Sequence, residues 1–93
     1  MADTSLLDLK KTSQFRKDLK RMVKRQLDID LLDEIVQTLR ERKPLDSKHR
    51  DHALSGDYVG FRECHIQADW LLIYYVDGEN LVLTASRTGT HSD

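Results

Sequence analysis

The sequence predicts an α+β protein in which an antiparallel-rich sheet packs against a two-helix hairpin. The first half places apolar residues at helical spacing, whereas the second half contains three short apolar runs typical of strands. Pro44 falls between these two patterns and favours the end of the helical part. The 93 residues provide enough chain for one hydrophobic core, so we expect a single domain over residues 1–93.

The first half begins with a short segment and continues with two amphipathic stretches. Residues 5–10 are compatible with an edge strand or with the start of a helix. Thr12 and Ser13 are good N-cap residues for a first helix that reaches Arg25. Its apolar stripe consists of Phe15, Leu19, Met22 and Val23. A second helix is expected to begin after Asp28 or Asp30 and to end at Pro44, with apolar positions Leu31, Leu32, Ile35, Val36 and Leu39.

The second half changes to a strand pattern. Residues 45–56 are polar and irregular, and the three strand candidates are residues 58–66, 71–76 and 80–87. Asp77-Gly78 is a good tight-turn signal between the last two strands. The predicted order is therefore β-α-α-β-β-β, with the helical pair on one face of the sheet.

Composition excludes several functional classes. The longest near-continuous apolar run, residues 71–76, is far shorter than the roughly 20 residues that cross a bilayer. The first residues lack the basic region of a secretory signal, and a single cysteine suits a reducing compartment, so we expect a cytoplasmic protein without a membrane partner. Cys64 is the only cysteine, which leaves no internal disulfide and no thiol pair for zinc.

Charge is divided unevenly along the chain. Residues 1–50 carry 13 Lys and Arg against 9 acids, and residues 51–93 carry 2 against 7. Eight of these cations and a single acid fall within residues 10–25. This helix is either a solvated surface or a dock for RNA phosphates, which is sequence-independent and sensitive to salt. Its candidate contacts are Lys17, Lys20, Arg21, Lys24 and Arg25.

Side chains suited to proton transfer gather at the ends of the predicted strands. They are His52, His65, Asp69, Arg87 and His91. In a meander, the turn after the first strand and the end of the third lie at the same edge of the sheet, which brings the last four within reach. Gly89 permits a tight turn that would direct Arg87 and His91 to one phosphate. Acid–base groups with a fixed cation suit phosphodiester cleavage. The alternative is a set of ordinary surface histidines, with Arg87 and Asp69 forming an ion pair.

Other reactive residues carry weaker signals. No common metal-ligand spacing occurs, and His49 with His52 is a weak match in an irregular segment. Cys64 and His65 point to opposite faces of one strand, so Cys64 is expected in the core. Trp70 is either a base-stacking residue or a half-buried core residue.

Four segments of the second half, taken in order, strongly resemble the YafQ-type toxins of the RelE superfamily. They are Arg50-Asp51-His52-Ala53-Leu54-Ser55-Gly56, Gly60-Phe61-Arg62-Glu63-Cys64-His65-Ile66, Asp69-Trp70-Leu71-Leu72-Ile73-Tyr74 and Arg87-Thr88-Gly89-Thr90-His91-Ser92. The resemblance covers nearly the whole chain, including the helical pair. It implies a RelE-like fold and the toxin of a bacterial type II toxin–antitoxin system, an endoribonuclease that cleaves mRNA in the ribosomal A site and is inhibited by a DinJ/RelB-like antitoxin.

The resemblance also implies residue roles. His91 and Asp69 become the leading acid–base pair, Arg87 stabilises the phosphorane, and His52 and His65 assist. Trp70 belongs to the RNA-binding set, and the basic helix becomes a dock on ribosomal RNA. The implied reaction is attack of the ribose 2′-OH on the adjacent phosphate, without metal or other cofactor.

Two features differ from the family pattern. Ala53 replaces a common proline, and no aromatic residue follows His91 in this sequence. His49 matches no family position, so we expect no role for it. The alternative function is a non-catalytic relative that binds RNA or an antitoxin and represses its own operon.

Overall fold

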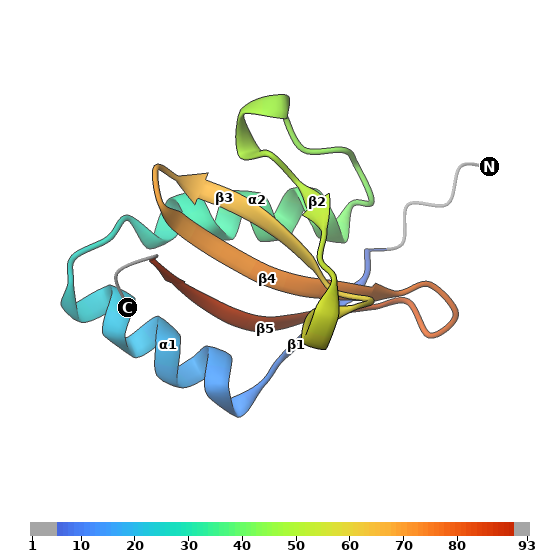
Figure 1. Ribbon diagram of the computed structural model, residues 1–93, viewed down its shortest axis with the longest axis horizontal. Helices are drawn as coiled ribbons and strands as arrows, with labels where there is room; N and C mark the ends of the chain where they lie inside the picture. Colours follow the sequence, from blue (N-terminus) through green and yellow to red (C-terminus); the bar gives the residue numbers. More distant parts are fainter. Residues whose placement is uncertain (1–5, 91–93) are drawn as a thin grey trace.

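The computed structural model describes residues 6–90, which form two helices on a five-stranded sheet (Figure 1). The strands are β1 (Asp8–Lys11), β2 (His52–Ala53), β3 (Arg62–Gln67), β4 (Trp70–Asp77) and β5 (Val82–Thr90). The helices are α1 (Ser13–Lys24) and α2 (Ile29–Arg40), with short 3₁₀ turns η1 (Ser47–His49) and η2 (Gly56–Tyr58). The predicted α+β class and order of elements are confirmed, with β2 as an additional short strand.

The strands are arranged in the order β1-β5-β4-β3-β2. β1 is parallel to β5, and every other neighbouring pair is antiparallel. The chain leaves β1 at one edge, builds both helices and returns at the opposite edge through β2 (Figure 1). Of the two alternatives for residues 5–10, the structure has the edge strand, which runs from Asp8 to Lys11.

Both helices begin at predicted caps. The Thr12 hydroxyl accepts a hydrogen bond from the Phe15 amide at 3.0 Å, and the Asp28 carboxylate accepts one from the Asp30 amide at 3.1 Å. The second helix ends at Arg40 rather than at Pro44. Arg42 adopts a left-handed φ of 60°, which ends the helix before the proline is reached.

Two strand predictions need correction. Residues 58–61, predicted to begin a strand, instead lie at the end of η2 and in the turn that follows it, where Gly56 and Gly60 adopt φ values of 65° and 92°. At the other end, β5 continues through Gly89 to Thr90, so the tight turn expected at Gly89 is absent. An irregularity in register instead falls near Ser86, where Ile73 opposes Arg87 but Tyr74 opposes Ala85.

The core lies between the helices and one face of the sheet. It contains Phe15 and Met22 from α1, four apolar residues of α2, and the inward side chains of β3, β4 and β5. Val23, predicted in the apolar stripe, is 56% exposed, and Asp18 occupies the buried face of α1 instead.

The opposite face of the sheet, which we call the open face, is only partly covered. Its side chains are half-buried rather than buried: Glu63, His65, Leu71, Ile73, Tyr75 and Arg87. Within residues 6–90, no helix is long and apolar enough to span a membrane.

α1 also completes the edge of β5. β1 pairs only with Val82 to Ala85, and beyond that point α1 runs beside β5 (Figure 1). The Thr12 hydroxyl donates to the Ser86 carbonyl at 2.8 Å, and the Asp18 carboxylate accepts from the Thr88 amide at 3.2 Å. Polar side chains of a helix thus replace a strand where β1 ends.

Candidate active site on the open face of the sheet

The strand register places several predicted site residues on the open face. His52, Glu63, Ile73 and Arg87 form one cross-strand row, and His65, Leu71 and Gly89 form the next. Neighbouring strands are about 4.8 Å apart, so His52 and Arg87 stand roughly 14 Å from each other along their row. An extended ligand, rather than a small molecule, is needed to touch both.

Arg87 is fixed by Asp18. The Arg87 Nε and Nη2 atoms donate to the two carboxylate oxygens at 2.7 and 3.4 Å. The Asp18 side chain is fully buried, while that of Arg87 is 43% exposed. This two-point contact orients the planar guanidinium and leaves part of it in solvent. The ion pair considered between Arg87 and Asp69 is therefore replaced by one with Asp18.

The same contacts set the charge states. Burial raises the pKa of Asp18, but hydrogen bonds from Arg87, Gln14 and the Thr88 amide outweigh it and hold the pKa below its ordinary value. The hydrogen bond to Asp18 raises the pKa of Arg87. At neutral pH, Asp18 is thus an anion that holds the Arg87 cation at the sheet surface.

A small cleft of about 230 Å³ opens beside this arginine. Leu71, Ile73 and Gly89 belong to the rows of the open face, while Arg21 of α1 and Tyr58 of η2 also line the cleft. It therefore joins the basic helix to the fixed arginine. We refer to it as the Arg87 cleft.

His52 is oriented by its own loop. Its Nδ1 lies 2.6 Å from the Arg50 carbonyl, which can only accept, so Nδ1 carries the proton. Its Nε2 faces the Glu63 carboxylate at 3.5 Å. The His52 ring is thus held between its own loop and β3, with its Nε2 atom on the side of Glu63.

A second polar network holds the loop that carries His52. Tyr74 donates its hydroxyl to the Asp51 carboxylate at 2.6 Å, and Arg62 Nε donates to the same oxygen at 3.3 Å. Burial and the neighbouring Asp51 raise the pKa of Tyr74 well above its usual range. The loop before β2 is thereby tied to β3 and β4.

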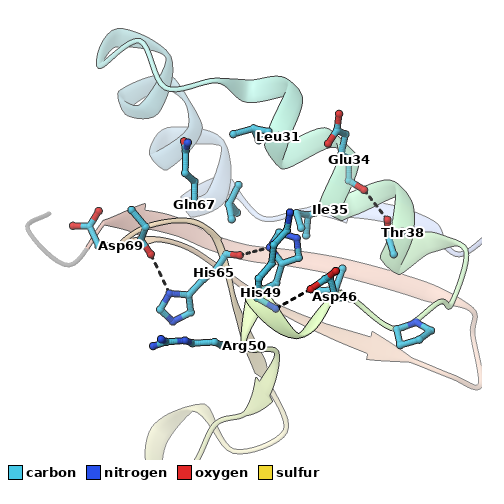
Figure 2. Close-up of a pocket in the computed structure, with 15 residues that line it drawn as sticks. Leu31, Glu34, Ile35, Thr38, Asp46, His49, Arg50, His65, Gln67 and Asp69 are labelled. Atoms are coloured by element: carbon cyan, nitrogen blue, oxygen red, sulfur yellow. Dashed lines mark hydrogen bonds between the residues drawn. The ribbon is translucent and has the colours of Figure 1, made fainter.

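His65 and Asp69 line a larger groove of about 900 Å³ between α2 and η1 (Figure 2). His65 donates from Nδ1 to the Ala68 carbonyl at 3.1 Å, and His49 donates from Nδ1 to the His65 carbonyl at 2.7 Å. This bond ties η1 to β3 and gives His49 a structural contact, while the expectation that His49 has no role in activity stays a prediction. Asp69 is exposed in the turn that follows.

The end of β5 approaches this turn. Thr90 pairs with Trp70, which directly follows Asp69 in the chain. His91 lies outside the described residues, so its relation to Asp69 and Arg87 stays a prediction.

Trp70 and Cys64 are core residues. Trp70 is 2% exposed and donates its indole N–H to the Thr88 hydroxyl at 2.9 Å, so its ring offers no face to a base. A role for Trp70 in stacking on RNA is therefore incompatible with its burial. Cys64 is fully buried, and burial raises the pKa of its thiol to about 12.

The five candidate cations of the basic helix are all exposed. Arg21 reaches the Arg87 cleft, and Arg25 donates to the Thr90 hydroxyl at 3.1 Å. Positive charge therefore borders the open face along β5. Among residues 6–90, no group of three or more His, Cys, Asp or Glu side chains is placed to hold a metal ion.

Solved structures resemble this chain over most of its length. A metal-bound toxin from Helicobacter pylori shares 39% identity and a TM-score of 0.87, covering 94% of this chain and 97% of its own. The Escherichia coli DinJ–YafQ toxin–antitoxin complex matches at 34% identity and a TM-score of 0.84, covering 94% of each chain. The fold is therefore that of the RelE-like toxins.

Sequence comparison defines the family. Residues 7–93 match the family described as the bacterial toxin of type II toxin–antitoxin systems, YafQ. The mRNA interferase toxin YafQ of Escherichia coli K12 is 35% identical over 86 residues, covering 91% of each chain. This chain belongs to the YafQ toxin family, which confirms the sequence-based resemblance. The Escherichia coli relatives are named mRNA interferases, which are endoribonucleases.

Sequence reasoning missed four residues of this region: Asp18, His49, Tyr58 and Glu63. Asp18 was visible as the single acid among eight cations. Glu63 was detectable by its alternation with His65 in a predicted strand. His49 and Tyr58 gave no local signal, since the groups they approach, the His65 carbonyl and the Arg87 cleft, lie farther along the chain.

Proposed function

We propose that this protein is a toxin that cleaves mRNA on the ribosome as an endoribonuclease. The observation that carries the proposal is Arg87, a cation held by a buried carboxylate and directed into a cleft that the basic helix also borders. A fixed arginine is suited to the charge that develops on a phosphate during cleavage. The family and its curated mRNA interferases support the same reaction class.

The reaction is attack of a ribose 2′-OH on the adjacent phosphate. A base removes the 2′-OH proton, an acid protonates the departing 5′-oxygen, and the products are a 2′,3′-cyclic phosphate and a 5′-OH. We assign the phosphorane charge to Arg87 and the two proton transfers to His91 and Asp69. His52 and His65 then orient the RNA or relay protons, and the scheme assigns no step to a metal.

The substrate path follows the charge of the surface. The exposed cations of the basic helix bind phosphates of ribosomal RNA, while mRNA crosses the open face. Roughly 14 Å separates Arg87 from His52. This span favours a polynucleotide over a mononucleotide.

A cognate antitoxin completes the proposed system. A chain in the Escherichia coli DinJ–YafQ complex matches this one along most of its length. We therefore infer that a small DinJ/RelB-like antitoxin binds and inhibits this protein in the cytoplasm.

The test is single-turnover cleavage on ribosomes programmed with a defined mRNA. We expect Arg87→Ala to slow cleavage by about 10²–10³-fold. Lys43→Ala, which also removes one exposed positive charge, is expected to cleave as the wild type does. Products should carry cyclic phosphate and 5′-OH ends, and EDTA should leave the rate unchanged. Ribosome binding without cleavage by the wild type would instead support the non-catalytic, RNA-binding alternative.

A further inference from the structure

Tyr58 forms one wall of the Arg87 cleft. Among the described residues that line this cleft, Tyr58 is the only aromatic one, and it is 39% exposed. Arg21 and Arg87 line the same hollow. The cleft thus combines a partly exposed ring with two guanidinium groups.

Backbone hydrogen bonds and ring contacts hold Tyr58 in place. The Tyr58 amide donates to the Ser55 carbonyl at 3.2 Å, and the Phe61 amide donates back to the Tyr58 carbonyl at 2.9 Å. The Tyr58 and Phe61 rings meet edge to face, with centroids 5.7 Å apart and an interplanar angle of 85°. Phe61 meets Tyr75 in the same manner at 5.1 Å. Phe61 therefore supports Tyr58 while covering at most one face of its ring.

The chemistry of the lining favours a nucleotide. Two cations and one buried acid leave net positive charge, which attracts a phosphate. Leu71, Ile73 and Gly89 give an apolar floor without a bulky polar group. A volume of about 230 Å³ lies below the range of pockets for drug-sized ligands and suits one base with its phosphate.

We propose that Tyr58 is the platform of a nucleobase subsite, on which a base of the mRNA beside the scissile phosphate stacks. Arg87 and Arg21 hold the phosphates attached to that nucleotide. This inference rests on the proposed endoribonuclease function and adds a contact that orients the substrate. Every base has a stacking face, so the subsite strengthens binding more than it selects sequence.

The test compares three variants of Tyr58 in single-turnover cleavage on programmed ribosomes. Tyr58→Phe keeps the ring and should change the half-saturating protein concentration by less than about threefold. Tyr58→Leu and Tyr58→Ala remove the stacking surface and should raise it roughly ten- to hundredfold. Val59→Ala, at a neighbouring side chain that is 74% exposed, is the matched control and should behave as the wild type. Thermal unfolding of each variant checks that the fold is retained.

A second measurement separates this inference from the proposed function. A short RNA with 2′-deoxy substitution at the cleavage site cannot react, so its binding is followed by NMR shifts without cleavage. Weaker binding by folded Tyr58→Leu, with Tyr58→Phe unchanged, supports the subsite even if the wild type proves inactive as a nuclease. Equal binding and equal half-saturation for the wild type and Tyr58→Leu would overturn the subsite. If Arg87→Ala still slowed cleavage as expected in that case, the nuclease function would stand without the subsite.

Discussion

Replacing Asp18 by asparagine tests the contact that fixes Arg87. The carboxylate accepts two hydrogen bonds from Arg87, one from the Thr88 amide and one from Gln14 at 3.1 Å. Asparagine keeps one acceptor oxygen, loses the charge and turns an N–H₂ group toward these donors. The variant therefore both weakens and misdirects the contact between α1 and β5.

The size of the expected loss of stability in Asp18→Asn follows from the burial of the two side chains. Losing one partner of a fully buried ion pair costs about 3–5 kcal/mol. Asp18 is fully buried, but Arg87 is 43% exposed and regains solvent once released. We therefore expect a lower cost of about 2–3 kcal/mol in the free energy of unfolding. At about 4–8 °C per kcal/mol for a domain of this size, the melting temperature should fall by roughly 10–20 °C.

Urea unfolding followed by Trp70 fluorescence measures this change, because Trp70 is the only tryptophan and is buried. Asp33→Asn is the matched control, since Asp33 is exposed on α2 and its substitution should change stability by less than about 0.5 kcal/mol.

The same urea experiment at lower pH provides a second check. The pKa of Asp18 is lowered in the folded protein, so its contribution is complete above about pH 4, the ordinary aspartate value. This stabilisation is lost as the pH falls below that value. The difference in the free energy of unfolding between the wild type and Asp18→Asn should then become smaller. A difference in the free energy of unfolding below about 0.5 kcal/mol between the two proteins at neutral pH would refute the reasoning.

Three other predictions concern separate parts of the protein. His49→Ala removes the bond to the His65 carbonyl and should lower stability by about 1 kcal/mol in urea unfolding; an unchanged midpoint would show that η1 is held otherwise. Cys64, buried with a raised pKa of about 12, should resist a disulfide reagent at pH 8 until urea unfolds the protein, and rapid labelling of the folded state would contradict this burial. Reversal to glutamate of Lys17, Lys20 and Lys24 should weaken ribosome binding and flatten its dependence on salt, as measured by sedimentation. Unchanged binding would leave that helix as a solvated surface.

The sequence by itself determined the local features of the fold. Thr12 and Asp28 cap their helices as expected, because a cap depends on a side chain and an amide only two or three residues away. The opposite orientations of Cys64 and His65 follow from strand alternation. The sequence motifs that contain His52 and Arg87 were sufficient to indicate the family, although the distance between these two residues was not known.

Only the tertiary structure decided how the site is built. Arg87 meets a carboxylate 69 positions earlier in the chain, because α1 takes the place of a strand beside the end of β5. Local sequence patterns predict helices and strands from their periods, but they do not indicate which helix covers which edge of the sheet. Tyr58 likewise reaches the Arg87 cleft from a 3₁₀ turn, where the sequence predicted the start of a strand. Both the burial of Trp70 and the hydrogen bonds from Arg87 and Thr88 that keep the buried Asp18 ionised arise only when these distant segments pack together.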